Sequence, residues 1–257
     1  MFPGKVLKWI NQDELGQAVA TLAFQVGAEV LDLPPAMHET RPVAMCPKAA
    51  KIYREMERDM IAEVEAGIMT AGNALVKLLR LQQLTGGWAQ IDDGPLVQVD
   101  TAKQDCLEDL LTDLPTAEPV VVFCRFRKDL EAVRQVAEHL GRRYGELSGE
   151  RRGGLTDTAT MRPDIDVLGV QTQSGGVGID LTRAAYCVYY SIGFSLSDYD
   201  QSLARLHRPG QTRPVRYYHL VATGTVDEAV YAAIGHRRDV IEEVLKHLTR
   251  APVEAVR

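Results

Sequence analysis

From residue 118 onward, short apolar runs alternate with segments of helical pattern, and this alternation restricts the fold more than any other feature. The runs are VVVFC, YGEL, DVLGVQT, YCVYYS and VRYYHLV. A strand that is apolar on both faces must be covered on both faces, and parallel strands require crossover segments between them. The sequence therefore predicts an α/β fold with three α/β/α layers around a mostly parallel sheet.

The chain before this region has a different, mainly helical pattern. Apolar residues recur at four-residue spacing from Ile52 to Val64, and a second helical segment, NALVKLLRLQQL, stops at Gly86. A proline-punctuated extended stretch, LDLPPAMHETRPVAM, interrupts the helical pattern. A turn rich in Gly and Asp follows the second helix. We therefore expect a helical N-terminal appendage, residues 1–95, and an α/β domain, residues 96–257.

Composition excludes several classes of protein. Apolar residues make up 46% and charged residues 25%, which is typical of a chain with a buried core, and the net charge of -6 excludes a uniformly basic nucleic-acid binder. The four cysteines form no pair with metal-ligand spacing, so we expect no metal site. The first residues, MFPGKVLKWINQDE, lack the apolar core of a signal peptide, and no run approaches about 20 apolar residues. We expect no membrane association and a cytoplasmic protein, in the host cytoplasm if its origin is viral.

A glycine-rich segment, TQSGGVGIDL, follows the run DVLGV. In an open α/β sheet, ligands bind at the carboxyl ends of the strands. Gly176 and Gly178 allow backbone N–H groups to approach a phosphate, Thr172 and Gln173 add side-chain donors, and Asp180 is a candidate acceptor for a ribose hydroxyl. A tight turn between a strand and a helix needs the same glycines, so the cluster alone leaves both interpretations open.

Two arginines stand near the end of a predicted helix in DYDQSLARLHRPGQ. Gln201 and Arg205 share a helix face, and Arg205 and Arg208 are neighbours on it. Two guanidiniums at one helix end suit a polyphosphate. The alternative is a solvated basic helix end. The absence of any acidic residue from Gln201 to Val226, in a stretch that also contains His207, Arg213 and Arg216, favours an anion site.

The segment VVVFCRFRK places Arg125, Arg127 and Lys128 directly after a buried strand. Basic and aromatic side chains that alternate at a strand end can bind a nucleic-acid backbone. An ordinary helix start with surface charge accounts equally well for Arg127 and Lys128.

These segments, in this order, resemble the second, C-terminal RecA-like lobe of Swi/Snf-type superfamily-two helicases and translocases. VVVFCRF resembles the strand that opens that lobe, TQSGGVGIDLTRA its glycine loop, and QSLARLHRPGQ its arginine-finger helix. The resemblance covers residues 101–245, and the preceding helices resemble the protrusion and brace of the same family. The segment ERRGGLTDTATMRPDI is short where a longer crossover helix is usual, which suggests a compact phage or bacterial version.

The resemblance implies a role for each candidate residue. Arg205 and Arg208 would be arginine fingers for an ATP held mainly by another lobe, and Gln201 would position them. The nucleotide side would be lined by Gly176, Gly178 and Asp180. Nucleic-acid backbone would be bound by Thr172, Gln173, Arg125, Arg127 and Lys128.

Two motifs of a complete motor are missing from the sequence. It contains neither GxxxxGK[ST] nor a DExH-type acidic strand end for magnesium. We therefore predict half of a DNA-dependent ATPase, which shares ATP and Mg²⁺ with an N-terminal RecA-like lobe and does not hydrolyse ATP alone. That lobe would belong to a longer chain or to a separate gene product. The alternative function is a non-catalytic module that binds nucleic acid or a partner protein. A metabolic α/β enzyme is disfavoured because no nucleophile or acid–base pair stands out.

Overall fold

The computed structural model describes residues 11, 13–14, 17–18, 31–66, 71–90, 94–174 and 178–235. Contacts divide the chain into two units, Met1–Leu33 and Pro34–Arg257, and nearly all described residues lie in the second. Most of the N-terminal 30 residues, Gly176 in the predicted glycine loop and the predicted extension of the last helix to Leu248 fall outside the described residues.

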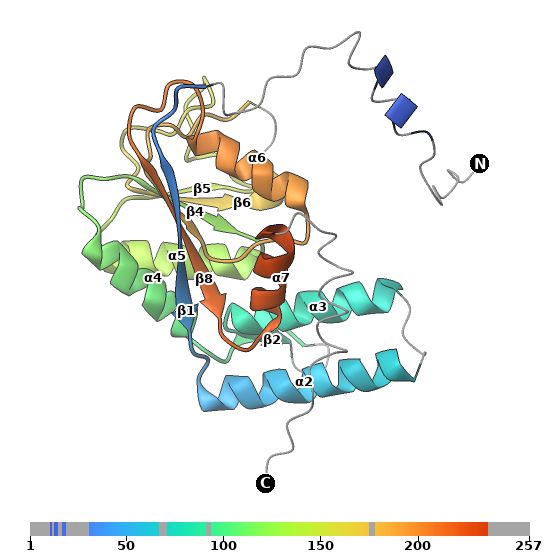
Figure 1. Cartoon of the computed structure of the whole chain (residues 1–257). Helices are drawn as coiled ribbons and strands as arrows, with labels where there is room; N and C mark the ends of the chain where they lie inside the picture. Colours follow the sequence, from blue (N-terminus) through green and yellow to red (C-terminus); the bar gives the residue numbers. More distant parts are fainter. Residues whose placement is uncertain are drawn as a thin grey trace. The chain divides into compact units, whose positions relative to one another are not determined.

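A six-stranded sheet forms the centre of the Pro34–Arg257 unit (Figure 1). Its strand order is β1-β8-β7-β4-β6-β5, and every neighbouring pair is parallel. The strands are β1 (Ala36–Val43), β4 (Val120–Cys124), β5 (Tyr144–Leu147), β6 (Val167–Gln171), β7 (Tyr186–Tyr189) and β8 (Val215–Ala222). The predicted parallel sheet is therefore confirmed.

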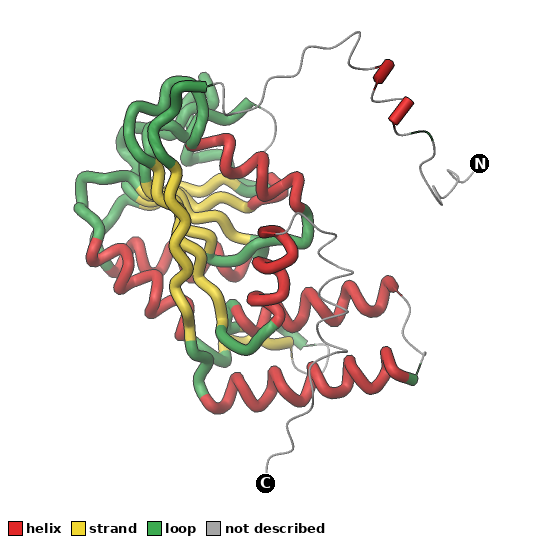
Figure 2. Tube along the Cα trace, viewed as in Figure 1, coloured by secondary structure: helices red, strands yellow, loops and turns green. Residues whose placement is uncertain are grey.

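Helices cover both faces of this sheet (Figure 2). One layer contains α4 (Ala102–Asp113) and α5 (Arg127–His139), and the other contains α6 (Leu196–Leu206) and α7 (Val226–Gly235). Helices α2 (Pro47–Glu65) and α3 (Ala71–Thr85) lie beyond the end of the sheet, where α3 contacts α7 (Figure 1). Strand β4 shows why both layers are needed. Val120 and Val122 pack in the core beneath α4 and α5, whereas Val121 and Phe123 pack in the core of the opposite layer. The predicted three-layer α/β/α fold is confirmed.

Helices α2 and α3 lie in the N-terminal segment whose sequence pattern is helical, with Lys77 and Glu63 paired across them at 2.6 Å. Pro47 begins α2, and the Cys46 side chain accepts a hydrogen bond from the Ala49 N–H there. After α3 the chain reverses at Gly87, whose φ of +92° suits glycine. A two-stranded antiparallel sheet follows, β2 (Trp88–Gln90) with β3 (Leu96–Gln98), where the sequence indicated only a turn.

Strand β1 is the main difference from the sequence-based expectation. The stretch Ala36–Val43 was predicted only as an extended interruption of a helical segment, yet all eight of its residues pair with β8 at the sheet edge. Its exposed, charged side chains and Pro42 obscure the strand pattern, but both are typical of edge strands. The sheet thus takes one strand from the predicted N-terminal segment, and the division at residue 95 stays a prediction.

A buried polar network ties α3 to the rest of the unit. Lys103 Nζ lies 2.6 Å from Asp227 Oδ2 and 3.1 Å from the Tyr190 carbonyl oxygen. Thr85 Oγ1 donates to Asp227 Oδ1 at 3.0 Å, and Gln82 Nε2 donates to the Ile192 carbonyl at 3.0 Å. The network therefore connects the end of α3 with α4, α7 and the segment that leads from β7 to α6.

Candidate functional site

Two cavities lie side by side at the carboxyl edge of the sheet, separated by the end of β6. Val170 and Thr172 line one cavity, and Gln171 and Gln173 line the other. Val170 and Gln171 project to opposite sides of β6, as successive residues of a strand do, and Thr172 and Gln173 follow in the 3-10 helix Thr172–Ser174.

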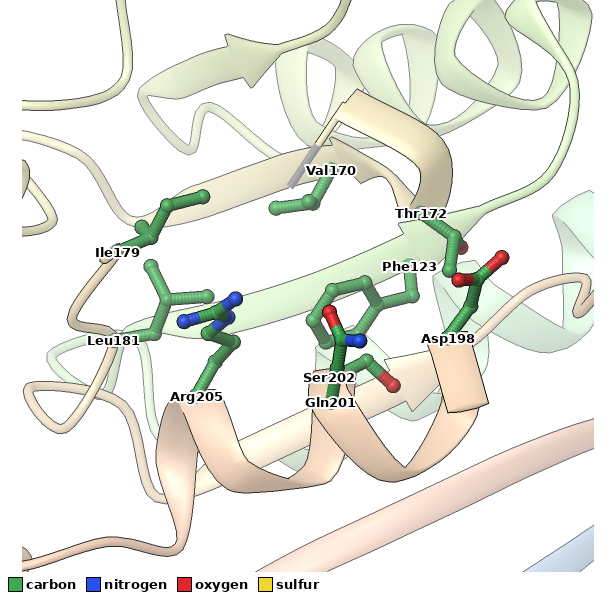
Figure 3. Close-up of a pocket in the computed structure, with 9 residues that line it drawn as sticks. All are labelled: Phe123, Val170, Thr172, Ile179, Leu181, Asp198, Gln201, Ser202 and Arg205. Carbon is green, nitrogen blue, oxygen red and sulfur yellow. The ribbon is translucent and has the colours of Figure 1, made fainter. Parts of the chain in front are cut away.

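The first, which we call the arginine cavity, lies between α6 and the ends of β4 and β6 (Figure 3). Figure 3 shows Gln201 and Arg205 projecting from α6 toward the strands. Its volume of about 20 Å³ holds about one water molecule, not a nucleotide. Its walls are Phe123, Val170, Thr172, Ile179, Leu181, Asp198, Gln201, Ser202 and Arg205.

Arg205, which lines this cavity, lies close enough to Arg208 for their charges to repel each other. Burial lowers the pKa of Arg205, and the charge of Arg208 lowers it further. Arg208 Nη1 donates to the Ile179 carbonyl oxygen at 3.2 Å. Two like charges held beside one another are complemented by an anion with several charged oxygens, as a polyphosphate has.

Asp180 stands next to this pair and is engaged with its own turn. Its Oδ1 accepts hydrogen bonds from the N–H of Thr182 at 2.9 Å and from Thr182 Oγ1 at 2.7 Å. Burial acts to raise the pKa of Asp180, but these hydrogen bonds and the charge of Arg208 outweigh it and lower the pKa. Gly178 is exposed, with a φ of +99°. The predicted role of Asp180 toward a ribose stays a prediction, as does that of Gly176.

The end of the arginine helix is held by Gln211, which the sequence indicated only as the last residue of a motif. Gln211 is buried, and its Nε2 donates to the carbonyl oxygens of Thr182 and Ala184 at 3.1 and 3.0 Å. Gly210 before it has a φ of +103°. These contacts fix the chain that carries Arg208. No sequence signal revealed this role, because the residues it joins are about 30 positions apart.

The basic residues around the arginine pair are not all part of the site. Arg213 forms an ion pair with Glu118 and donates to the Arg183 carbonyl, and His207 Nε2 lies 2.7 Å from the Pro34 carbonyl oxygen. The acidic partner comes from a distant part of the chain, so the absence of acids between Gln201 and Val226 overstated the size of the anion site.

The second cavity, which we call the basic cavity, gathers four of the five residues predicted to bind nucleic acid. It has a volume of about 350 Å³. It is lined by Leu79, Gln83, Trp88, Leu96, Arg125, Phe126, Arg127, Lys128, Asp129, Gln171 and Gln173. Thr172 is the exception: it lines the arginine cavity, and its Oγ1 donates to the Cys124 carbonyl oxygen at 3.3 Å. The structure therefore separates Thr172 from Gln173.

Two cations of the basic cavity, Arg127 and Lys128, have different partners. Arg127 pairs with Glu150 at 2.6 Å, and both side chains are more than 60% exposed. Lys128 pairs with Glu131 at 2.7 Å and lies 4.9 Å from the centre of the Trp88 ring.

Arg125 lies partly buried between β4 and α6. Its backbone N–H donates to Ser191 Oγ at 2.7 Å, and its guanidinium lies against Gly193. Burial lowers its pKa, although the charge of Asp198 on α6 acts in the opposite direction. Arg125 lines the basic cavity and Asp198 lines the arginine cavity, so the charges of the two cavities interact through this pair.

Asp129, at the back of the basic cavity, is a residue that sequence analysis missed, because RFRKD was interpreted through its basic residues. Its Oδ2 accepts hydrogen bonds from Ser191 Oγ and from the Phe126 N–H. Burial raises the pKa of Asp129 to about 6, against the lowering effects of Ser191, Lys103 and Phe126. The folded protein therefore retains a proton that the unfolded chain releases at lower pH.

This pKa gives a pH dependence of stability. Between about pH 4 and about pH 6 the folded state binds more protons at Asp129 than the unfolded state, so its contribution to the free energy of unfolding falls as pH rises, by roughly 3 kcal/mol. Chemical denaturation of the wild type and of Asp129→Asn across this range tests the effect. The free energy of unfolding of the variant should lack this fall.

The histidine His219 also contributes to the pH dependence in this range. Burial and the charge of His38 lower its pKa to about 3, so its contribution to the free energy of unfolding rises with pH. This contribution is the same in both proteins and cancels in the difference between them. Parallel pH profiles would contradict the assignment.

Comparison with known proteins identifies the central part of the chain. Residues 102–210 match the family model described as the helicase conserved C-terminal domain. This region of the chain is therefore similar to helicase C-terminal domains. The matched region runs from α4 to just beyond α6 and therefore contains both arginines and the predicted glycine loop.

The helicase C-terminal domain has relatives among chromatin-remodelling ATPases. The chain is 30% identical over 168 residues to "Chromatin-remodeling ATPase INO80" of Drosophila melanogaster, which covers 62% of this chain and 10% of that protein. It is 30% identical over 233 residues to "Helicase swr1" of Schizosaccharomyces pombe, and this match covers 89% of this chain and 16% of that protein. The chain thus spans less than a fifth of the length of these relatives.

Solved structures show the same RecA-like α/β fold. The C-terminal part of the Fun30 ATPase domain has a TM-score of 0.62 at 15% identity, covering 84% of this chain and 97% of that one. The Sulfolobus solfataricus SWI2/SNF2 ATPase core in complex with dsDNA has a TM-score of 0.60 at 19% identity, covering 92% and 52%. These relatives are eukaryotic and archaeal, so the phage or bacterial origin stays a prediction.

Proposed function

We propose that this chain is the C-terminal motor lobe of a DNA-dependent ATPase. The observation that carries the proposal is that Gln201 and Arg205 line one cavity and Arg205 lies within reach of the charge of Arg208, in a region that matches the helicase conserved C-terminal domain. A lobe that only bound a partner would have no use for two arginines held so close together.

In this function the two arginines act on an ATP bound mainly by an N-terminal RecA-like lobe. A guanidinium placed on the transferred phosphoryl group stabilises the negative charge that develops there. Gln201 and Gln211 would keep the arginines in place, and Gly178 and Asp180 would face the nucleotide. The small arginine cavity fits a site that is completed by another lobe. The described residues contain no cluster of three metal-ligating side chains, so the ligands of Mg²⁺ would come from that lobe and from ATP.

DNA would be bound at the basic cavity, with Arg127, Lys128 and Gln173 at the backbone. Arg127→Ala should weaken DNA binding several-fold and make the logarithmic salt dependence shallower by about one phosphate contact. Glu150→Ala should act in the opposite direction, because it releases Arg127 from its exposed ion pair. Binding titrations at several salt concentrations measure both effects. Unchanged salt dependence in Arg127→Ala would remove this residue from the interface.

A reconstitution experiment tests the proposed function itself. The chain alone should show no ATP hydrolysis, and the chain mixed with its N-terminal lobe and duplex DNA should show hydrolysis that depends on all three components. Tight, strongly salt-dependent DNA binding by the chain alone, with no ATPase activity in any mixture, would instead favour the non-catalytic binding module.

A further inference from the structure

The walls of the basic cavity are more apolar than a phosphate site requires. Leu79 from α3, Trp88 from β2, Leu96 from β3 and Phe126 before α5 surround it. Its volume of about 350 Å³ falls at the lower end of the ~300–1,000 Å³ range of small-molecule sites. A phosphate gains nothing from apolar walls, whereas a flat aromatic group does.

Three of the polar side chains that line the same cavity are amides, and the other four are charged: Arg125, Arg127, Lys128 and Asp129. Gln83, Gln171 and Gln173 each present an N–H donor and a carbonyl acceptor. A phosphate only accepts hydrogen bonds, but the edge of a nucleobase both donates and accepts.

Two of the three positive charges, those of Arg127 and Lys128, lie toward the outside, whereas Arg125 is partly buried. The side chain of Arg127 is 69% exposed and that of Lys128 is 33% exposed. The exposed pair of Arg127 with Glu150 is weak enough to exchange for a phosphate. This charge distribution favours a nucleic-acid strand over an apolar peptide, because it places anionic backbone at the mouth and an uncharged group inside.

We propose that the basic cavity binds an unstacked nucleobase, with the adjoining phosphates on Arg127 and Lys128. The inference rests on the proposed nucleic-acid function and extends it, since the motor lobe would contact a base as well as the backbone. The base would come from a single strand or from a locally distorted duplex.

Fluorescence anisotropy with the full chain tests this inference. A labelled oligothymidine strand should bind roughly tenfold more tightly than a strand of the same length built from abasic sites, because one base stacks in the cavity. Leu96→Ala should remove most of this difference by taking away one wall. Val97→Ala is the matched control, because Val97 follows Leu96 on β3, is 37% exposed and does not line the cavity. This control should keep the full difference.

Equal binding of the two strands to the wild type would overturn the nucleobase inference, and so would equal effects of Leu96→Ala and Val97→Ala. If both strands bind equally and Arg127→Ala weakens both, the proposed backbone binding survives without the base pocket. If neither strand nor duplex DNA binds in the reconstituted complex, the proposed DNA function fails as well.

Discussion

Arg208→Ala should lower DNA-stimulated ATP hydrolysis by roughly 10³-fold or more in the complex of this chain with its N-terminal lobe. Arg208 is held by the Ile179 carbonyl beside Arg205, and removing it would leave the charge on the transferred phosphoryl group without its permanent counter-charge. Steady-state phosphate release at saturating ATP and DNA measures the loss. Arg208→Lys should recover little of the rate, because an ammonium lacks the two parallel donors of a guanidinium.

A neighbouring exposed arginine provides the control for this experiment. Arg216 lies on β8 with its side chain exposed and lines neither cavity. Arg216→Ala should keep wild-type activity while it changes the net charge equally. DNA binding and the folding midpoint of Arg208→Ala should stay close to those of the wild type. Comparable ATPase activity in Arg208→Ala and Arg216→Ala would contradict the assignment of Arg208 as an arginine finger.

Lys103→Ala should lower the free energy of unfolding by roughly 3–5 kcal/mol. Lys103 is 1% exposed and faces Asp227 at 2.6 Å, so its removal leaves a carboxylate buried without its counter-ion. It also removes the donor that holds the Tyr190 carbonyl. Urea denaturation followed by circular dichroism measures the effect.

The appendage offers a matched comparison for Lys103. The pair of Lys77 and Glu63 has the same distance of 2.6 Å, but its side chains are 27% and 44% exposed. Lys77→Ala should therefore cost less than about 1 kcal/mol. Replacing both members of the buried pair, as in Lys103→Met with Asp227→Leu, should recover part of the loss, because no uncompensated charge remains. If Lys77→Ala and Lys103→Ala lowered the free energy of unfolding by similar amounts, burial would not be what makes the Lys103–Asp227 pair important.

Some parts of the fold could be predicted from sequence because they depend on local pattern. The run VVVFC is apolar at every position, and only a strand covered on both faces can bury all five residues. The helical spacing from Ile52 to Val64 likewise indicated α2. Strand β1 could not be predicted as part of the sheet, since its pairing with β8 joins residues about 180 positions apart and its exposed side chains follow no apolar alternation.

The sequence determined the residue types of the candidate site, and the tertiary structure decided their grouping. Spacing along one helix was sufficient to bring Gln201 and Arg205 to one face, because helical geometry is local. Only the folded chain showed that Arg213 pairs with Glu118, and only the folded chain showed that Thr172 and Gln173, in the 3-10 helix after β6, line different cavities. Asp129 and the apolar walls of the basic cavity come from α3, β2, β3 and α5, so burial and long-range packing, which no local pattern records, created that site.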